Sequence, residues 1–134
     1  MSCKSLIYTA MNTSATVPVN GTLPLGSIIR RYGCNCDLNG NGIRISGAGY
    51  YDADVTVTAV PTAAGTVTVQ LLQDGVAVPG ATASATASAA SDSVMLAFPA
   101  TLRLGCCSNG SLLTLLLTGT ASTVTNVAVR VEKI

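Results

Sequence analysis

The feature that most constrains the fold of this chain is a two-residue alternation of apolar and polar side chains. In residues 50–60, Tyr51, Val55 and Val57 share one side of an extended segment, while Asp52 and Asp54 share the other. Successive side chains of a strand point to opposite faces, so this pattern predicts a strand with one buried face. No segment carries a convincing 3.6-residue apolar stripe, so we expect an all-β fold.

Ten segments bounded by Gly, Pro, Asn and Ser are predicted to be strands: residues 4–11, 22–32, 42–46, 51–60, 65–73, 76–78, 82–88, 93–104, 112–118 and 124–133. Their regular spacing favours a two-sheet antiparallel sandwich or jelly roll. A chain of 134 residues can bury one core, so residues 1–134 are predicted to form a single domain. Residues 1–31 would supply its N-terminal strands and a candidate docking segment.

The apolar side of these strands defines the predicted core: Tyr51, Val55, Val57, Val67, Val69, Leu71, Leu113, Leu115, Val127 and Val129. Two segments, residues 4–11 and 112–117, are apolar on both faces, which a strand with one face in water would not be. We therefore expect Leu6, Tyr8, Leu112 and Leu116 to lie on an outer sheet face or in a subunit interface, covered by a copy of the same protein.

Composition excludes several classes of function. The sequence has no histidine, so it lacks the commonest general base and cannot build a conventional Ser-His-Asp triad. The net charge is +1, and Arg30-Arg31 is the only basic pair, so we expect no nucleic-acid partner; the arginines, Arg103 and Arg130 among them, are interpreted as rim or inter-subunit salt-bridge partners. No apolar run reaches about 18 residues, so neither membrane insertion nor an export signal is expected. We predict no enzyme activity, no catalytic residues and no cofactor.

The segment CNCDLNGNG, residues 34–42, contains the D-x-N-x-N-G opening of a calcium loop. An EF-hand loop ends in a bidentate acid at its twelfth position, where this chain has Ala48. Asn-Gly pairs are typical of tight turns, so residues 37–42 are interpreted as a turn rather than a metal site. Asp74-Gly75 predicts a second tight turn.

Four cysteines form a candidate thiol cluster: Cys34, Cys36, Cys106 and Cys107. In an extended C-x-C segment the first two would share a face. Buried free thiols are the favoured interpretation, followed by a disulfide between the two loops, a tetrathiolate metal site and redox chemistry. Asp52 and Asp54 also share a face, but we interpret them as solvent-facing rather than as a metal site.

From Tyr32 onward the order of these signals resembles the C1q/TNF-like jelly-roll family, in the form found in the C-terminal domains of bacterial collagen-like surface proteins and short stand-alone relatives in Gram-positive bacteria and their phages. The matching motifs are GAGYY at residues 47–51, VTVQL at 67–71 followed by DGV at 74–76, LRLG at 102–105 leading into LTL at 113–115, and VTNVAVRV at 124–131. The resemblance implies a ten-stranded jelly roll that assembles as a homotrimer. No Gly-X-Y repeat precedes these motifs, which favours docking on a larger viral or surface assembly through the N-terminus.

These observations predict a non-enzymatic structural protein, a homotrimeric surface module of a bacteriophage virion that serves as a head decoration, fibre or fibre tip. Such a protein would be assembled in the bacterial cytoplasm and released by lysis. Two alternatives are a spore-coat or bacterial cell-surface adhesion module, and a carbohydrate-binding module that recognises a host-surface glycan through loop residues such as Tyr50 and Asn109.

Overall fold

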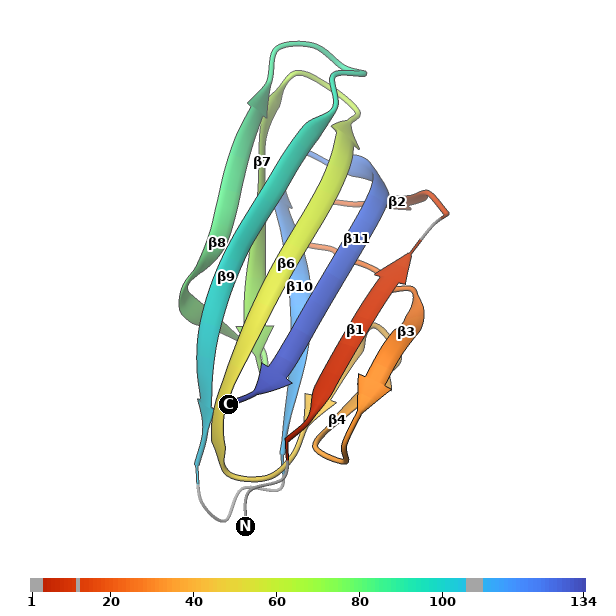
Figure 1. The fold of residues 1–134 in the computed structure, drawn as a ribbon. Coiled ribbons are helices and arrows are strands. Elements are labelled where there is room, and N and C mark those ends of the chain that lie inside the picture. Colours follow the sequence, from red (N-terminus) through yellow and green to blue (C-terminus); the bar gives the residue numbers. More distant parts are fainter. Residues whose placement is uncertain (1–3, 12, 106–109) are drawn as a thin grey trace.

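The computed structural model describes residues 4–11, 13–105 and 110–134, and these form eleven β-strands in two stacked antiparallel sheets (Figure 1). The two-sheet antiparallel sandwich predicted from the alternation is therefore confirmed. Among the described residues there is no helix long and apolar enough to cross a membrane.

One sheet, called the front sheet here, faces the viewer in Figure 1 and has the strand order β3-β1-β11-β6-β9, with the short strand β2 paired to β11. Its strands are β1 (Leu6–Met11), β2 (Ala15–Val17), β3 (Ser27–Tyr32), β6 (Gly49–Pro61), β9 (Val94–Leu104) and β11 (Ser122–Lys133). The back sheet has the order β4-β5-β10-β7-β8. Its strands are β4 (Cys36–Asn39), β5 (Gly42–Ile45), β7 (Gly65–Gln73), β8 (Val76–Ala87) and β10 (Ser111–Gly119).

The core fills the space between the two sheets. All ten residues of the core set named from the sequence are at most 2% exposed. Strand β6 shows the mechanism, because Tyr51, Val55 and Val57 point inward while Asp54 is exposed on the other side. Leu23 and Leu25 close one flank of the core, and backbone hydrogen bonds connect the segment around Leu23 to β10.

Four segments differ from the sequence prediction. Of residues 22–32, predicted as a broken strand, only Ser27–Tyr32 form a strand, and Thr22 makes an isolated bridge to Leu116. Strand β2 was not expected, and β4 falls where a turn was expected, so that the turn is shorter and lies at Gly40-Asn41, with Gly40 at a φ of 62°. The segments predicted as two strands, residues 76–78 and 82–88, form one strand, because β8 runs through Pro79-Gly80 with a register shift opposite β7. The tight turn at Asp74-Gly75 is confirmed, and both residues have positive φ.

The described part of the N-terminal segment belongs to the body of the sandwich. Strand β1 lies between β3 and β11, and Ile7 is fully buried. A docking function of residues 1–31 would therefore use the surface of this segment. Three large apolar side chains within it are well exposed: Val19, Ile28 and Ile29.

Candidate assembly surface

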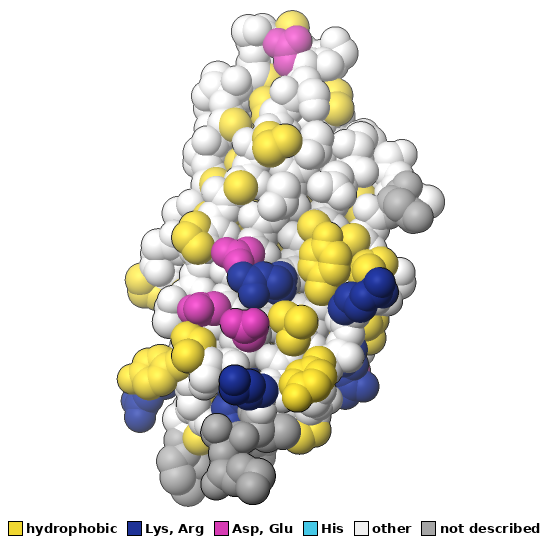
Figure 2. All heavy atoms as spheres, viewed as in Figure 1, with side chains coloured by type: hydrophobic (Ala, Val, Ile, Leu, Met, Phe, Trp, Pro, Cys, Tyr) yellow, Lys and Arg dark blue, Asp and Glu magenta, His cyan; other side chains and the backbone are white. Residues whose placement is uncertain are grey.

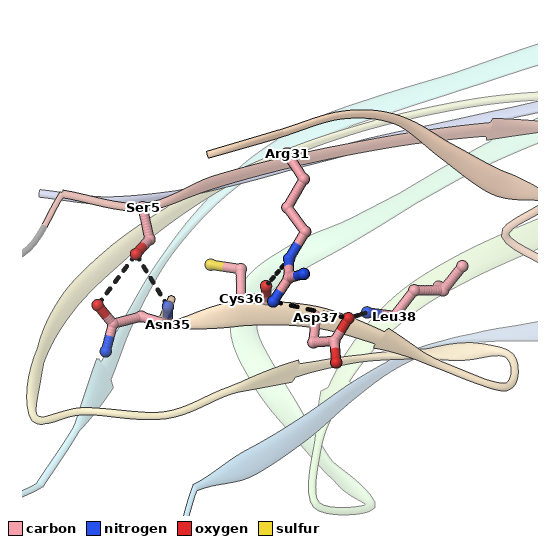
Figure 3. Close-up of polar contacts among 6 residues, drawn as sticks. All are labelled: Ser5, Arg31, Asn35, Cys36, Asp37 and Leu38. Atoms are coloured by element: carbon pink, nitrogen blue, oxygen red, sulfur yellow. Dashed lines mark hydrogen bonds and ion pairs between the residues drawn. The ribbon is translucent and has the colours of Figure 1, made fainter. Parts of the chain in front are cut away.

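The motif CNC is held in place by its central asparagine. The backbone N–H of Asn35 donates to Ser5 Oγ over 2.9 Å, and the Ser5 hydroxyl donates to Asn35 Oδ1 over 3.0 Å (Figure 3). The Asn35 side-chain amide donates to the Ser46 carbonyl over 2.6 Å, and the Ser46 N–H donates back to the Asn35 carbonyl over 2.8 Å. Asn35 therefore links β1 to the chain that leaves β5.

Asp37, the acid of the calcium-like opening, already has partners within the chain. One Asp37 carboxylate oxygen accepts the Leu38 N–H over 2.9 Å and lies 3.9 Å from the Arg31 guanidinium (Figure 3). Arg31 Nε also donates to the Cys36 carbonyl over 2.9 Å. These contacts connect β3 to β4, so the segment joins two strands at the end of the sandwich. No group of three His, Cys, Asp or Glu side chains that could hold a metal occurs within the described ranges.

The two cysteines of the motif lie in different environments, which corrects the expectation that they share a face. Cys36 is 1% exposed in β4 and its thiol is free, whereas Cys34 precedes the strand and is exposed. Burial raises the pKa of the Cys36 thiol to about 11, partly opposed by Arg31 and Lys133. The interpretation as a buried free thiol therefore holds for Cys36 and does not hold for Cys34. Cys106 and Cys107 lie outside the described residues.

Tyr51, on β6, binds backbone groups at the same end of the molecule. Its ring is fully buried, and its hydroxyl contacts the carbonyl oxygens of Ser46 and Gly47 at 2.6 and 2.7 Å. Burial raises the pKa of Tyr51 to about 12, with smaller contributions from Cys36 and Cys34. Asn35 and Tyr51 thus both bind the Ser46 carbonyl, and this polar cluster is structural.

The edges of both sheets are protected against the addition of further strands. Edge strand β3 carries two arginines and a register shift that leaves Ile29 as an extra residue opposite β1. Edge strands β9 and β8 contain Pro99 and Pro79, and β4 has only four residues. Charges, bulges, prolines and short length are the usual means by which edges avoid pairing. Addition of a partner's strand to either sheet is therefore disfavoured.

The outward side of the front sheet, called the front face here, mixes apolar and charged side chains (Figure 2). The strand register places its residues in rows across the sheet: Tyr32, Leu6, Glu132, Asp52 and Thr101 in one row, and Arg30, Tyr8, Arg130, Asp54 and Pro99 in the next. Leu6 and Tyr8 are partly buried among these polar neighbours. Charged side chains gather over the lower half of the face in Figure 2, and the upper half is largely uncharged.

An ion-pair network crosses the middle of the front face. The Arg130 guanidinium pairs with the Asp54 carboxylate and lies 3.6 Å from Glu132. The hydrogen bond to Asp54 is the main cause that raises the pKa of Arg130. Asp52 instead accepts the Thr101 hydroxyl over 3.0 Å. Asp52 and Asp54 therefore share a face, as their spacing predicts, but bind different partners.

The outward side of the back sheet, the back face, has a different character. Hydroxyl pairs bridge its strands, with Thr68 Oγ1 2.8 Å from Ser84 Oγ and Thr66 Oγ1 3.1 Å from Thr86 Oγ1. Leu112 and Leu116 lie on this face and are partly buried, and the segment at Thr22 bridges to Leu116 along β10. The four side chains assigned from the sequence to one interface or outer face thus divide into two pairs on opposite sides of the molecule.

Exposed residues that the sequence reasoning did not single out include Val76, Met95 and Tyr32, at 70, 69 and 64%. The alternation of β9 could have identified Met95, because Val94 and Leu96 on either side of it are buried. Tyr50, proposed for glycan binding, is 54% exposed, and its companion Asn109 lies outside the described residues.

Comparison with solved structures identifies the fold. The globular domain of zebrafish complement 1qA superposes with a TM-score of 0.70 at 10% identity, covering 96% of this chain and 95% of that one. Murine APRIL gives a TM-score of 0.70 at 13% identity, with 98% and 99% covered. PRD1 vertex protein P5 gives 0.56 at 13% identity, with 100% and 99% covered. No family model matches the sequence, and no curated protein matches it. The chain has a C1q/TNF-like jelly-roll fold.

Proposed function

We propose that this chain is a non-enzymatic structural protein that forms a homotrimer on the surface of a bacteriophage virion, as a head decoration, fibre or fibre tip. The observation that carries the proposal is the front face, where Leu6 and Tyr8 lie beside the network of Arg130, Asp54 and Glu132. Interfaces combine apolar anchors, arginine and a polar rim in this way. The fold supports a trimer, because trimeric assembly is what a C1q/TNF-like jelly roll implies.

The protected sheet edges support an assembly of fixed size. A sandwich with open edges can add strands without limit, whereas contacts between faces can close into a ring. The front face is favoured over the back face because its opposite charges provide complementarity, whereas hydroxyl side chains occupy much of the back face. The similarity in fold to a vertex protein supports a particle surface as the location.

Light scattering after size exclusion tests the trimer. Three copies of 13.4 kDa give about 40 kDa. We expect Tyr8→Arg on the front face to produce monomers, and the matched variant Leu116→Arg on the back face to remain trimeric. A wild-type protein that stays monomeric across concentrations would overturn the proposal, and a trimer that only Leu116→Arg dissociates would move the interface to the back face.

We propose that the N-terminal part of the chain, where Val19, Ile28 and Ile29 are exposed, docks on the particle. We expect the variant Val19→Asp with Ile29→Asp to remain trimeric but to be lost from particles purified from a lysate on a density gradient, as mass spectrometry would show. The unmodified protein should co-purify with particles in a fixed ratio. Its recovery in a spore-coat or cell-envelope fraction instead would favour the adhesion alternative.

A further inference from the structure

A cavity of about 380 Å³ opens at the end of the front face where β1, β3 and β11 meet. Its apolar lining comes from Leu6, Tyr32 and Ile134, and Glu132 contributes a carboxylate. Lys4 and Lys133 also line it. The Glu132 side chain is 49% exposed although it lies 3.6 Å from Arg130, so a second cation can reach it. The cavity therefore offers an apolar floor with charges of both signs at its rim.

An exposed tip lies on the opposite flank of the molecule, where the β7–β8 hairpin meets β9. Val76 is 70% exposed and follows the turn that contains Asp74. Arg103 of β9 is exposed and lines a shallow hollow together with Val76. The Gln73 side chain donates to the Arg103 carbonyl over 3.4 Å, which connects the hairpin to β9. The tip thus presents an acid, an apolar side chain and a cation.

Tip and cavity lie at the same level along the strands. In the strand register, Arg103 of the tip lies opposite Tyr50, two residues along β9 from Thr101. Thr101 belongs to the row across the front sheet that ends at Leu6 and Tyr32, which line the cavity. A rotation about an axis roughly parallel to the strands preserves this level. The tip and the cavity are unlike surfaces, so a contact between them is heterologous. Such a contact builds a closed ring, here of three copies, when the rotation closes, and an open filament when it does not.

We infer that in the proposed trimer the Val76 tip of each copy inserts into the Leu6–Tyr32–Ile134 cavity of the next copy, with Arg103 facing Glu132. This inference rests on the proposed function and names the contact that would hold the ring together. Lys4 and Lys133 would repel Arg103, and Asp74 on the same tip supplies the opposite charge for them. The tip therefore carries charges of both signs, as the rim of the cavity does.

Charge reversal tests the contact, with trimer dissociation followed by light scattering and analytical ultracentrifugation of the full chain. We expect Arg103→Glu and Glu132→Arg each to weaken the trimer about tenfold or more, as single members of interface charge pairs do. The double variant restores the pair with its signs exchanged, so its dissociation should return to within about threefold of wild type. Val76→Ala should weaken the trimer, because it removes most of the apolar side chain that would fill the cavity.

The matched control is Asp92→Lys, a charge reversal at another exposed position, beyond the end of β8, which should leave the trimer unchanged. Circular dichroism of each variant checks that the monomer remains folded. A wild-type monomer would contradict the proposed function itself. A wild-type trimer that is indifferent to all three single variants would overturn only this contact, and single variants that weaken the trimer without rescue in the double variant would overturn the pairing of Arg103 with Glu132.

Discussion

Ser5 and Asn35 bind each other across 30 positions of the sequence: the Asn35 N–H donates to Ser5 Oγ over 2.9 Å, and the Ser5 hydroxyl donates to the Asn35 side chain. Ser5 is only 1% exposed, so water cannot replace it as a partner. The residue between the two cysteines therefore gives the CNC motif its structural role. It joins the start of β1 to the segment that precedes β4.

We expect Ser5→Ala to destabilise the protein by about 1–3 kcal/mol, because it leaves the Asn35 N–H without its partner. Urea unfolding at constant protein concentration measures the change. Ser93→Ala, at an exposed position, should change the free energy of unfolding by less than about 0.5 kcal/mol. Equal effects of the two substitutions would show that the Ser5–Asn35 link does not contribute to stability.

The hydroxyl of Tyr51 gives a second prediction for the same cluster. Tyr51→Phe keeps the buried ring and removes the group that contacts the Ser46 and Gly47 carbonyls. We expect a loss of about 1–2 kcal/mol in the free energy of unfolding. Tyr50→Phe, on the adjacent but 54% exposed tyrosine, is the matched control and should be nearly neutral. A neutral Tyr51→Phe would mean that Ser46 and Gly47 find other donors.

Alternation predicts which side chains of a strand point inward, but it does not say which sheet the strand joins. That is why the core residues of β6 could be predicted, while Leu6 and Leu116 were assigned together and lie on opposite faces. β1 pairs with β11, and β10 pairs with β7, and these long-range pairings leave no trace in a local pattern. The hydrogen bonds between Ser5 and Asn35 could not be predicted from the sequence for the same reason.

Strand β4 shows a different limit. It has four residues, one of which is a buried cysteine, and it borders on Asn-Gly pairs that indicate a turn. Such a strand forms because β5 and the Arg31 side chain bind it, so its own propensity contributes little. The tip at Val76 was missed because its exposure depends on how the hairpin lies against β9.

The lowered pKa of Asp74 predicts that the free energy of unfolding falls at acid pH. The Leu112 backbone N–H donates to its carboxylate, and this hydrogen bond, followed by one from Ser111 and by the charge of Arg44, lowers the pKa of Asp74 below 3.8. A lowered folded-state pKa means that the stabilisation is present above pH 3.8 and is lost as the pH falls through the folded-state value.

NMR titration of the Asp74 carboxyl should show the lowered pKa directly. Asp74→Asn should remove its share of the acid dependence, and because the side chain is largely exposed the loss at neutral pH should be small, about 0.5 kcal/mol. Asp92→Asn is the control at another exposed turn. A titration midpoint for Asp74 at or above 3.8 would contradict the prediction.

Thr9 offers a route to a more stable protein. It is fully buried in β1, and its hydroxyl oxygen has no hydrogen-bond partner among the residues that the structure describes. A buried polar group without a partner costs about 1–3 kcal/mol, while valine has the same shape and no polar atom to desolvate. We expect Thr9→Val to raise the free energy of unfolding by about 1 kcal/mol, measured by urea unfolding. Thr9→Ser is the matched control, because it keeps the unpaired hydroxyl and removes a buried methyl, so it should destabilise. A destabilising Thr9→Val would mean that the hydroxyl binds a buried water, since only a satisfied polar group is costly to remove.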